Sequence, residues 1–229
     1  MALKDLRSVL FNELNNLLQP HGFKWLKSKN QLVQKTSYGC NVISLTFLIS
    51  YAPKFIAEVR LYNEIDYLGN ILKQFDDRSL RAKNPTQFIF TAYIGDVLGY
   101  PPNYEYDNLR TEKDFFNAAH AIYNDMVKAG FEHFSMPTDA ITLDQIVNND
   151  PYAKLPLLFA WPYSDFRRYC IAITLAKLVN RANFEELVTI YRNLLQKSNR
   201  DIPNIVIPYY DNLVTYLRNT DIDTLRNLK

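Results

Sequence analysis

The polar residues of this chain that could carry chemistry are few and lie far apart in the sequence. The three histidines, His21, His120 and His133, have no second histidine or cysteine at metal-ligand spacing. Glu58 and Arg60 alternate on one side of an expected strand, and His120 lies on an expected helix. These three form the only polar set that we nominate for a cleft between sheet and helices, where they could bind a small ligand or do acid–base chemistry.

Structural roles explain the same residues more simply. Charged side chains on the open face of an antiparallel sheet pair with one another, and a histidine beside an apolar stripe is more often packed than catalytic. Cys40 and Cys170 are expected to be reduced core residues rather than nucleophiles. The sequence contains no G-x-S-x-G, G-x-x-x-x-G-K or G-x-G-x-x-G motif. We therefore expect no cofactor, no metal and no catalytic residues, as in a protein that is not an enzyme.

A second group of candidates is aromatic and lies in proline-containing stretches. Tyr100, Tyr104 and Tyr106 surround a Pro-Pro pair, while Trp161 and Tyr163 flank a single proline. Rigid aromatic side chains lose little entropy on binding and are enriched in interface hot spots. The pattern predicts contacts with a partner protein. The alternative is that these rings cover the seam between the sheet and the helices.

Charge and composition exclude several classes of protein. The net charge is +2, from 26 basic and 24 acidic residues, which gives no overall field for nucleic acid or an anionic membrane. Lysines gather at Lys24, Lys27, Lys29 and Lys35, where we expect a solvated face and keep nucleic-acid binding as the weakest hypothesis. The first 18 residues do not form a signal peptide, and no apolar run could cross a bilayer. We expect a cytoplasmic protein.

Hydrophobic periodicity divides the chain into an α/β part and a helical part. Leucines at steps of three and four predict a helix over residues 3–18, which Pro20 and Gly22 end. Strands are expected at 23–26, 31–36, 40–51, 55–62 and 87–94, with a helix at 65–75. The runs 40–51 and 55–62 alternate strongly and predict a central antiparallel hairpin.

Residues after Tyr106 are expected to be helical almost throughout. Helices are predicted at 112–129, 142–148, from Ser164, from 183 and from Pro208, with Thr111 as a cap and Gly130 as a stop. The sequence thus predicts an α+β fold, with an antiparallel sheet of four to five strands, an N-terminal helix and an α-helical C-terminal half. We expect one compact unit with sub-regions at 1–106 and 107–229.

Two short motifs in the first third carry a resemblance. Leu18-Gln-Pro-His-Gly22-Phe23-Lys24 follows a leucine-rich helix, and Asn41-Val42-Ile43-Ser44-Leu45 begins the expected hairpin. Between roughly Leu3 and Glu64, and less closely at 164–196, the chain resembles bacterial domains of unknown function of the immunity type, which are encoded near toxins. It departs from them at Thr46, where a glutamine is typical, and in its longer C-terminal half. The resemblance implies a binding protein and transfers no catalytic residue.

Three hypotheses follow for function. The first is a non-catalytic protein-binding protein, either of this immunity type or another interaction protein. The second is a ligand-binding protein or enzyme that uses Glu58, Arg60 and His120. The third is nucleic-acid binding through the lysines, which we do not expect. An exposed edge strand could also pair with a second copy of the chain and produce a homodimer.

Overall fold

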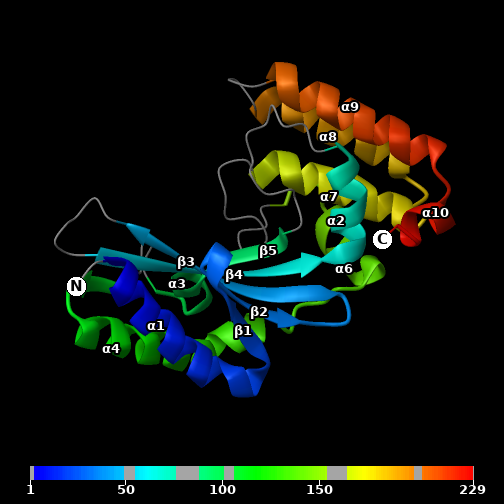
Figure 1. The fold of residues 1–229 in the computed structure, drawn as a ribbon. Helices are drawn as coiled ribbons and strands as arrows, with labels where there is room; N and C mark the ends of the chain where they lie inside the picture. Colours follow the sequence, from blue (N-terminus) through cyan, green and yellow to red (C-terminus); the bar gives the residue numbers. More distant parts are fainter. Residues whose placement is uncertain are drawn as a thin grey trace. The chain divides into compact units, whose positions relative to one another are not determined.

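The computed structural model describes residues 3–48, 55–75, 88–100, 106–153, 164–198 and 203–228. It confirms the α+β class, with an N-terminal helix, an antiparallel sheet and a helical C-terminal half. The chain forms two compact units (Figure 1). Unit 1 contains Met1–Asn63 and Phe90–Met136, and unit 2 contains Glu64–Ile89 and Pro137–Lys229.

This division differs from the expected boundary at Tyr106, because the chain passes between the two units three times. Composition shows which kind of element a segment forms, but the tertiary structure decides which distant segment that element packs against. The segment Phe90–Met136 therefore belongs to unit 1, although much of it is helical like the rest of the second half.

The first helix, α1, spans Leu3–Leu18, as the leucine spacing predicts. Its stripe is buried, since Leu10 and Leu14 are both fully inaccessible to solvent. A short 3-10 turn follows at Gln19–His21, and Gly22 then adopts a φ of 81°. Its N–H donates to the carbonyl of Gln19 at 2.9 Å. Glycine suits this left-handed turn because it has no Cβ to clash with the backbone.

Within the described residues six strands form the sheet, one more than the upper expected number. Their bounds are Phe23–Leu26 (β1), Gln31–Lys35 (β2), Gly39–Leu48 (β3), Phe55–Ile65 (β4), Phe88–Tyr93 (β5) and Tyr106–Leu109 (β6). The order is β1-β2-β3-β4-β5, and β6 also pairs with β4. In β1–β3 the antiparallel register sets Trp25 opposite Leu32, and Leu32 opposite Ile43.

Strand β6 lies where no strand was expected, between the proline-containing stretch that ends at Tyr106 and the helix predicted from 112. Tyr106 and Leu109 are buried, with two exposed residues between them, so the segment lacks the alternation that identifies a strand. Its pairing with β4 also contains a register shift between Phe55 and Ala57. Contact with β4, rather than local sequence, therefore stabilises this strand.

Helices α1 and α4 (Glu112–Asp125) lie side by side on the sheet of unit 1 (Figure 1). Thr111 and Asp114 form a capping box at the start of α4, which confirms the predicted cap. Gly130 does not end the helical path: a π-helical turn at Met126–Gly130 leads directly into α5 (Phe131–His133). The apolar core of unit 1 joins α1, α4 and one face of the sheet.

Unit 2 is built mainly from helices. They are α2 (Asp66–Leu72), α6 (Ala140–Asn148), α7 (Ser164–Leu178), α8 (Phe184–Ser198), α9 (Pro203–Asn219) and α10 (Ile222–Arg226), with the 3-10 turn Lys73–Phe75 after α2. The short helix α3 (Ile94–Val97) and the 3-10 turn Lys27–Lys29 belong to unit 1. Helix α9 begins five residues before the predicted start at Pro208, which lies inside it. Pro208 has no N–H, so it removes one intrahelical hydrogen bond from α9.

A hydrogen bond and a ring contact join β1, the outer strand of the sheet, to α1. In the described part of the chain, β1 has a strand neighbour only in β2, so its other edge carries backbone groups that no strand pairs. On β1 the backbone N–H of Trp25 donates to Oδ1 of Asn15 on α1 at 2.9 Å. The Trp25 ring also stacks on Phe11 of the same helix, with ring centroids 5.0 Å apart. A backbone N–H that is already hydrogen-bonded is less able to pair with a strand of a second chain, which argues against dimerisation through β1.

We predict that Asn15→Ala lowers the free energy of unfolding by about 1–3 kcal/mol, because it leaves the Trp25 N–H without an acceptor. Asn16→Ala is the matched control, since Asn16 is exposed on the same helix and the change in helix propensity is identical. Urea denaturation of both variants measures the difference. Equal stabilities would show that the Asn15 bond contributes nothing.

Candidate functional site

The structure does not bring the proposed polar set together. Glu58 and Arg60 form an ion pair along β4, with Oε2 and Nη2 3.1 Å apart, and the guanidinium of Arg60 lies 4.8 Å from the centre of the Tyr93 ring. Both alternate with Ala57 and Val59, which belong to the core beneath α1 and α4. Glu58 and Arg60 therefore occupy the opposite face of the sheet from that core.

His120 lies on α4, on the other side of this core. Its Nε2 is 3.0 Å from Oε1 of Glu13 on α1, and its ring centre is 4.7 Å from that of Phe116. The sheet separates His120 from Glu58 and Arg60, so these three side chains cannot act on one small molecule. The geometry does not support the hypothesis of a catalytic cleft built from them.

The aromatic candidates have different environments. Tyr106 is 7% exposed, and its hydroxyl donates to Oδ2 of Asp125 at 2.6 Å, so it is a core residue rather than a surface contact. Tyr100 is half-buried, and its hydroxyl accepts from Nζ of Lys128 at 3.0 Å. Tyr104, Trp161 and Tyr163 lie outside the described residues.

The other predicted histidines and cysteines are mostly packed. His133 is buried within α5 instead of lying in a loop, and His21 stacks on Phe131 with centroids 4.5 Å apart. Cys170 is buried, and its desolvation raises the pKa of the thiol, which keeps it protonated. Within the described part of the chain, no group of three or more His, Cys, Asp or Glu side chains could hold a metal ion.

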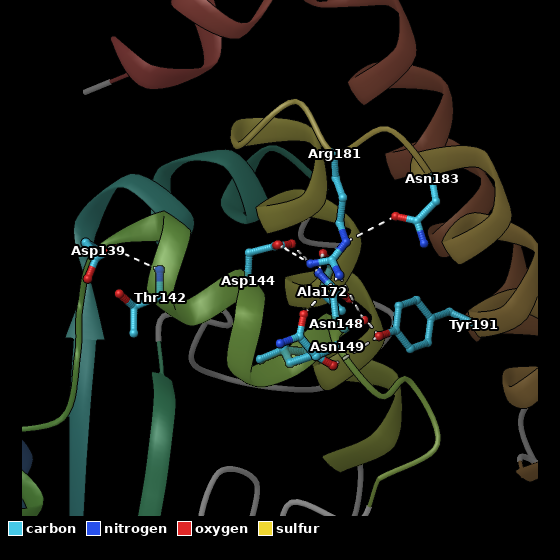
Figure 2. Close-up of polar contacts among 10 residues, drawn as sticks. Asp139, Thr142, Asp144, Asn148, Asn149, Ala172, Arg181, Asn183 and Tyr191 are labelled. Carbon is cyan, nitrogen blue, oxygen red and sulfur yellow. Dashed lines mark hydrogen bonds and ion pairs between the residues drawn. The ribbon is translucent and has the colours of Figure 1, made fainter.

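Sequence reasoning missed a polar network in unit 2, which Figure 2 shows. Asp144 of α6 accepts from Arg181, in the turn between α7 and α8, and from Nδ2 of Asn148 at 2.6 Å. Asn148 also donates to the carbonyl of Ala172 at 2.9 Å and accepts from the hydroxyl of Tyr191 at 2.7 Å. Asp144 and Asn148 are 4% and 2% exposed, so these bonds are made away from water.

Arg181 binds the carboxyl end of α6 as well as Asp144. Its Nη2 donates to the carbonyl of Asn148 at 3.4 Å and to Oδ1 of Asn149 at 3.1 Å, while its Nε donates to Asn183. A cation at this position also stabilises the negative end of the helix dipole. Burial raises the pKa of the Tyr191 phenol, which remains a neutral donor.

This network is structural rather than catalytic. Both carboxylate oxygens of Asp144 and the amide of Asn148 are engaged with fixed partners of the same unit, so a substrate would have to displace them. Asp144 and Asn148 are spaced i and i+4, beside the buried Leu143 and Val147. Two polar residues on the apolar side of a short helix are the signal that could have indicated the network from sequence.

We predict that Arg181→Ala lowers the free energy of unfolding by about 3–5 kcal/mol, because it leaves the carboxylate of Asp144 buried without a cation. Arg218→Ala is the control: Arg218 pairs with Glu185 through Nε and Oε1 at 2.9 Å, and both side chains are largely exposed. Removing this exposed pair is expected to cost less than about 1 kcal/mol. Comparable losses in urea denaturation would contradict the assigned role of Arg181.

A different surface of unit 1 has the character of a binding site. The α4 outer face is the name that we give to six outward residues of α4 and of the turn after it: Phe116, Asn117, His120, Ala121, Asn124 and Val127. The exposed Lys113 and Lys128 lie beside this set. Phe116 is 42% exposed and Val127 is 56% exposed, and the set contains no acidic residue, lysine or arginine. Two exposed apolar side chains thus lie on a helical surface that a lysine flanks at each end.

Comparisons of the chain with family models, with curated proteins and with solved structures find no match. Within the described residues, no helix is both long enough and apolar enough to cross a membrane. The argument for function therefore depends on the surfaces and contacts of the chain itself.

Proposed function

We propose that this is a non-catalytic binding protein that holds a partner protein through the α4 outer face. The observation that carries the proposal is the exposure of two large apolar side chains, Phe116 and Val127, in one row along a helix. Exposed apolar side chains with Lys113 and Lys128 at the margins resemble a protein–protein interface that has an apolar centre and a polar rim. The immunity-type resemblance of the first third implies the same kind of role.

The spacing of these residues suits a partner that lies along the helix. Phe116, His120, Asn124 and Val127 follow one another at steps of four, four and three, which places them in one row. The opposite side of α4 is used by Phe115 and other residues of the core. A single row of side chains is what a groove or a second helix recognises.

The centre of this face is held in place before any partner arrives. The imidazole of His120 contacts Glu13 on α1 at 3.0 Å and lies beside the Phe116 ring. Side chains that are already ordered lose less conformational entropy on binding. Helix α4 itself begins with a capping box and packs on the sheet core, so the row is presented on a rigid element.

We predict that Phe116→Asn combined with Val127→Asn weakens partner binding by about 2 kcal/mol or more, roughly thirtyfold, as the loss of an aromatic hot spot does. Ile141→Asn with Tyr152→Asn is the matched control, because these unit 2 residues are 64% and 67% exposed. A photoreactive amino acid at position 116 first captures the partner in the native host, and titration calorimetry then compares the variants.

Two results would count against the proposal. If a photoreactive amino acid captures the same amount of protein at position 141 as at position 116, the capture reflects nonspecific adhesion of exposed apolar residues. Undiminished binding by a folded Phe116→Asn, Val127→Asn protein would place the interface elsewhere. Capture of a second copy of this chain, with a concentration-dependent mass in sedimentation, would mean that the face serves a homodimer instead.

A further inference from the structure

The longest stretch without acidic residues lies between Glu13 and Glu58. It contains Lys24, Lys27, Lys29, Lys35 and Lys54 but no aspartate or glutamate, although the chain as a whole is nearly balanced in charge. Lys54 lies outside the described residues. The other four are exposed on β1, the 3-10 turn Lys27–Lys29 and β2, and we name these four the lysine hairpin.

The fold places these lysines close together. Lys24 lies opposite Val33 in the β1–β2 register, and Lys35 is two residues further along β2. Side chains two residues apart on one strand share a face, so Lys24 and Lys35 are diagonal neighbours on the face away from the buried Phe23. Lys27 and Lys29 occupy the turn that joins the same two strands.

No carboxylate in the described part of the chain forms an ion pair with any of these four lysines, whereas Arg60, Arg181, Arg192 and Arg218 each have one. Like charges held together on one short hairpin repel one another, and an acidic partner relieves that repulsion. The hairpin is also held rigidly, because Trp25 stacks on Phe11 and bonds to Asn15.

Two features favour an acidic protein segment over nucleic acid. Single-stranded nucleic acid needs aromatic rings on which bases stack. The aromatic residues of β1 are Phe23, which is buried, and Trp25. The Trp25 ring is occupied by Phe11, at 5.0 Å and nearly parallel, and by the ammonium of Lys27, 5.0 Å from the ring centre. Phosphate recognition also favours arginine, and the whole stretch between Glu13 and Glu58 contains none.

We infer that the lysine hairpin binds a carboxylate-rich segment of a partner protein. The inference rests on the proposed function, since it describes the charge of the partner that such a protein would hold. Its surface is nevertheless separate from the α4 outer face, because Lys24 and Lys35 point away from the core that α4 covers. Lysine ammonium groups attract flexible acidic segments over a distance and raise the rate of association.

The test uses a fluorescent oligoglutamate peptide and the full chain, with anisotropy measured at low and at physiological salt. The variant combines Lys24→Gln, Lys29→Gln and Lys35→Gln, and it keeps Lys27 because that side chain covers Trp25. The control combines Lys73→Gln, Lys113→Gln and Lys197→Gln, which are exposed lysines elsewhere. Each protein loses three charges, from +2 to −1, so the overall charge is matched.

We expect the hairpin variant to bind the peptide about tenfold more weakly at low salt, roughly the combined effect of three exposed ion pairs. The control is expected to lose less than about twofold, and binding by the natural protein should weaken as salt rises. Equal losses in both variants would overturn the inference, because overall charge alone would then explain binding. Absence of peptide binding by the natural protein at low salt would also overturn it.

Two further binding measurements distinguish an acidic protein segment from other polyanions. Tighter binding of single-stranded RNA of equal charge, lost in the hairpin variant alone, would assign the surface to nucleic acid instead. Binding of vesicles containing phosphatidylserine with the same pattern would assign it to a membrane. The Phe116→Asn, Val127→Asn protein is expected to bind the peptide normally, so the lysine inference and the proposed function can fail independently.

Discussion

The packing of α1 and α4 against one face of the sheet is the constraint on which unit 1 depends. Phe11 contacts Trp25 and Phe47 of the sheet, and Phe115 of α4 contacts Phe47 and Phe55. This aromatic layer determines which side of each strand is buried. Because side chains alternate along a strand, it also decides that Glu58, Arg60, Lys24 and Lys35 face the other way.

The same packing separates two surfaces that have different physical character. On α4 it turns Phe115 inward and leaves Phe116 outward, which produces a partly apolar helical face. On β1 and β2 it turns Phe23 and Leu32 inward and leaves lysines outward. Apolar side chains act in close contact, whereas the lysines act over longer distances, so the two surfaces differ in the range of their interactions.

Unit 2 depends on a buried ion pair instead. Asp144 is held by Arg181, and the surrounding amide and phenol groups complete the hydrogen bonding of a site from which water is excluded. Such a network specifies how α6 meets the α7–α8 turn, because any other arrangement would leave a buried charge unpaired. Its role in the fold explains why strongly polar residues lie here without any sign of catalytic use.

Several elements could be predicted from the sequence alone, because they depend on local periodicity. The leucine stripe predicted α1, the alternation at 40–62 predicted β3 and β4, and Thr111 predicted the cap of α4. These predictions succeeded because each depends on neighbouring residues, whose spacing matches the period of a helix or a strand.

Other features depend on contacts between residues that are distant in the sequence, so they became known only from the tertiary structure. Strand β6 exists because Tyr106 and Leu109 pair with β4, and Tyr106 is buried although its sequence environment suggested a surface loop. The separation of His120 from Glu58 and Arg60, and the meeting of Asp144 with Arg181, are likewise set by how whole elements pack. Periodicity specifies which face of a helix or strand is apolar. Which other element packs against that face depends on burial and charge pairing across the entire chain.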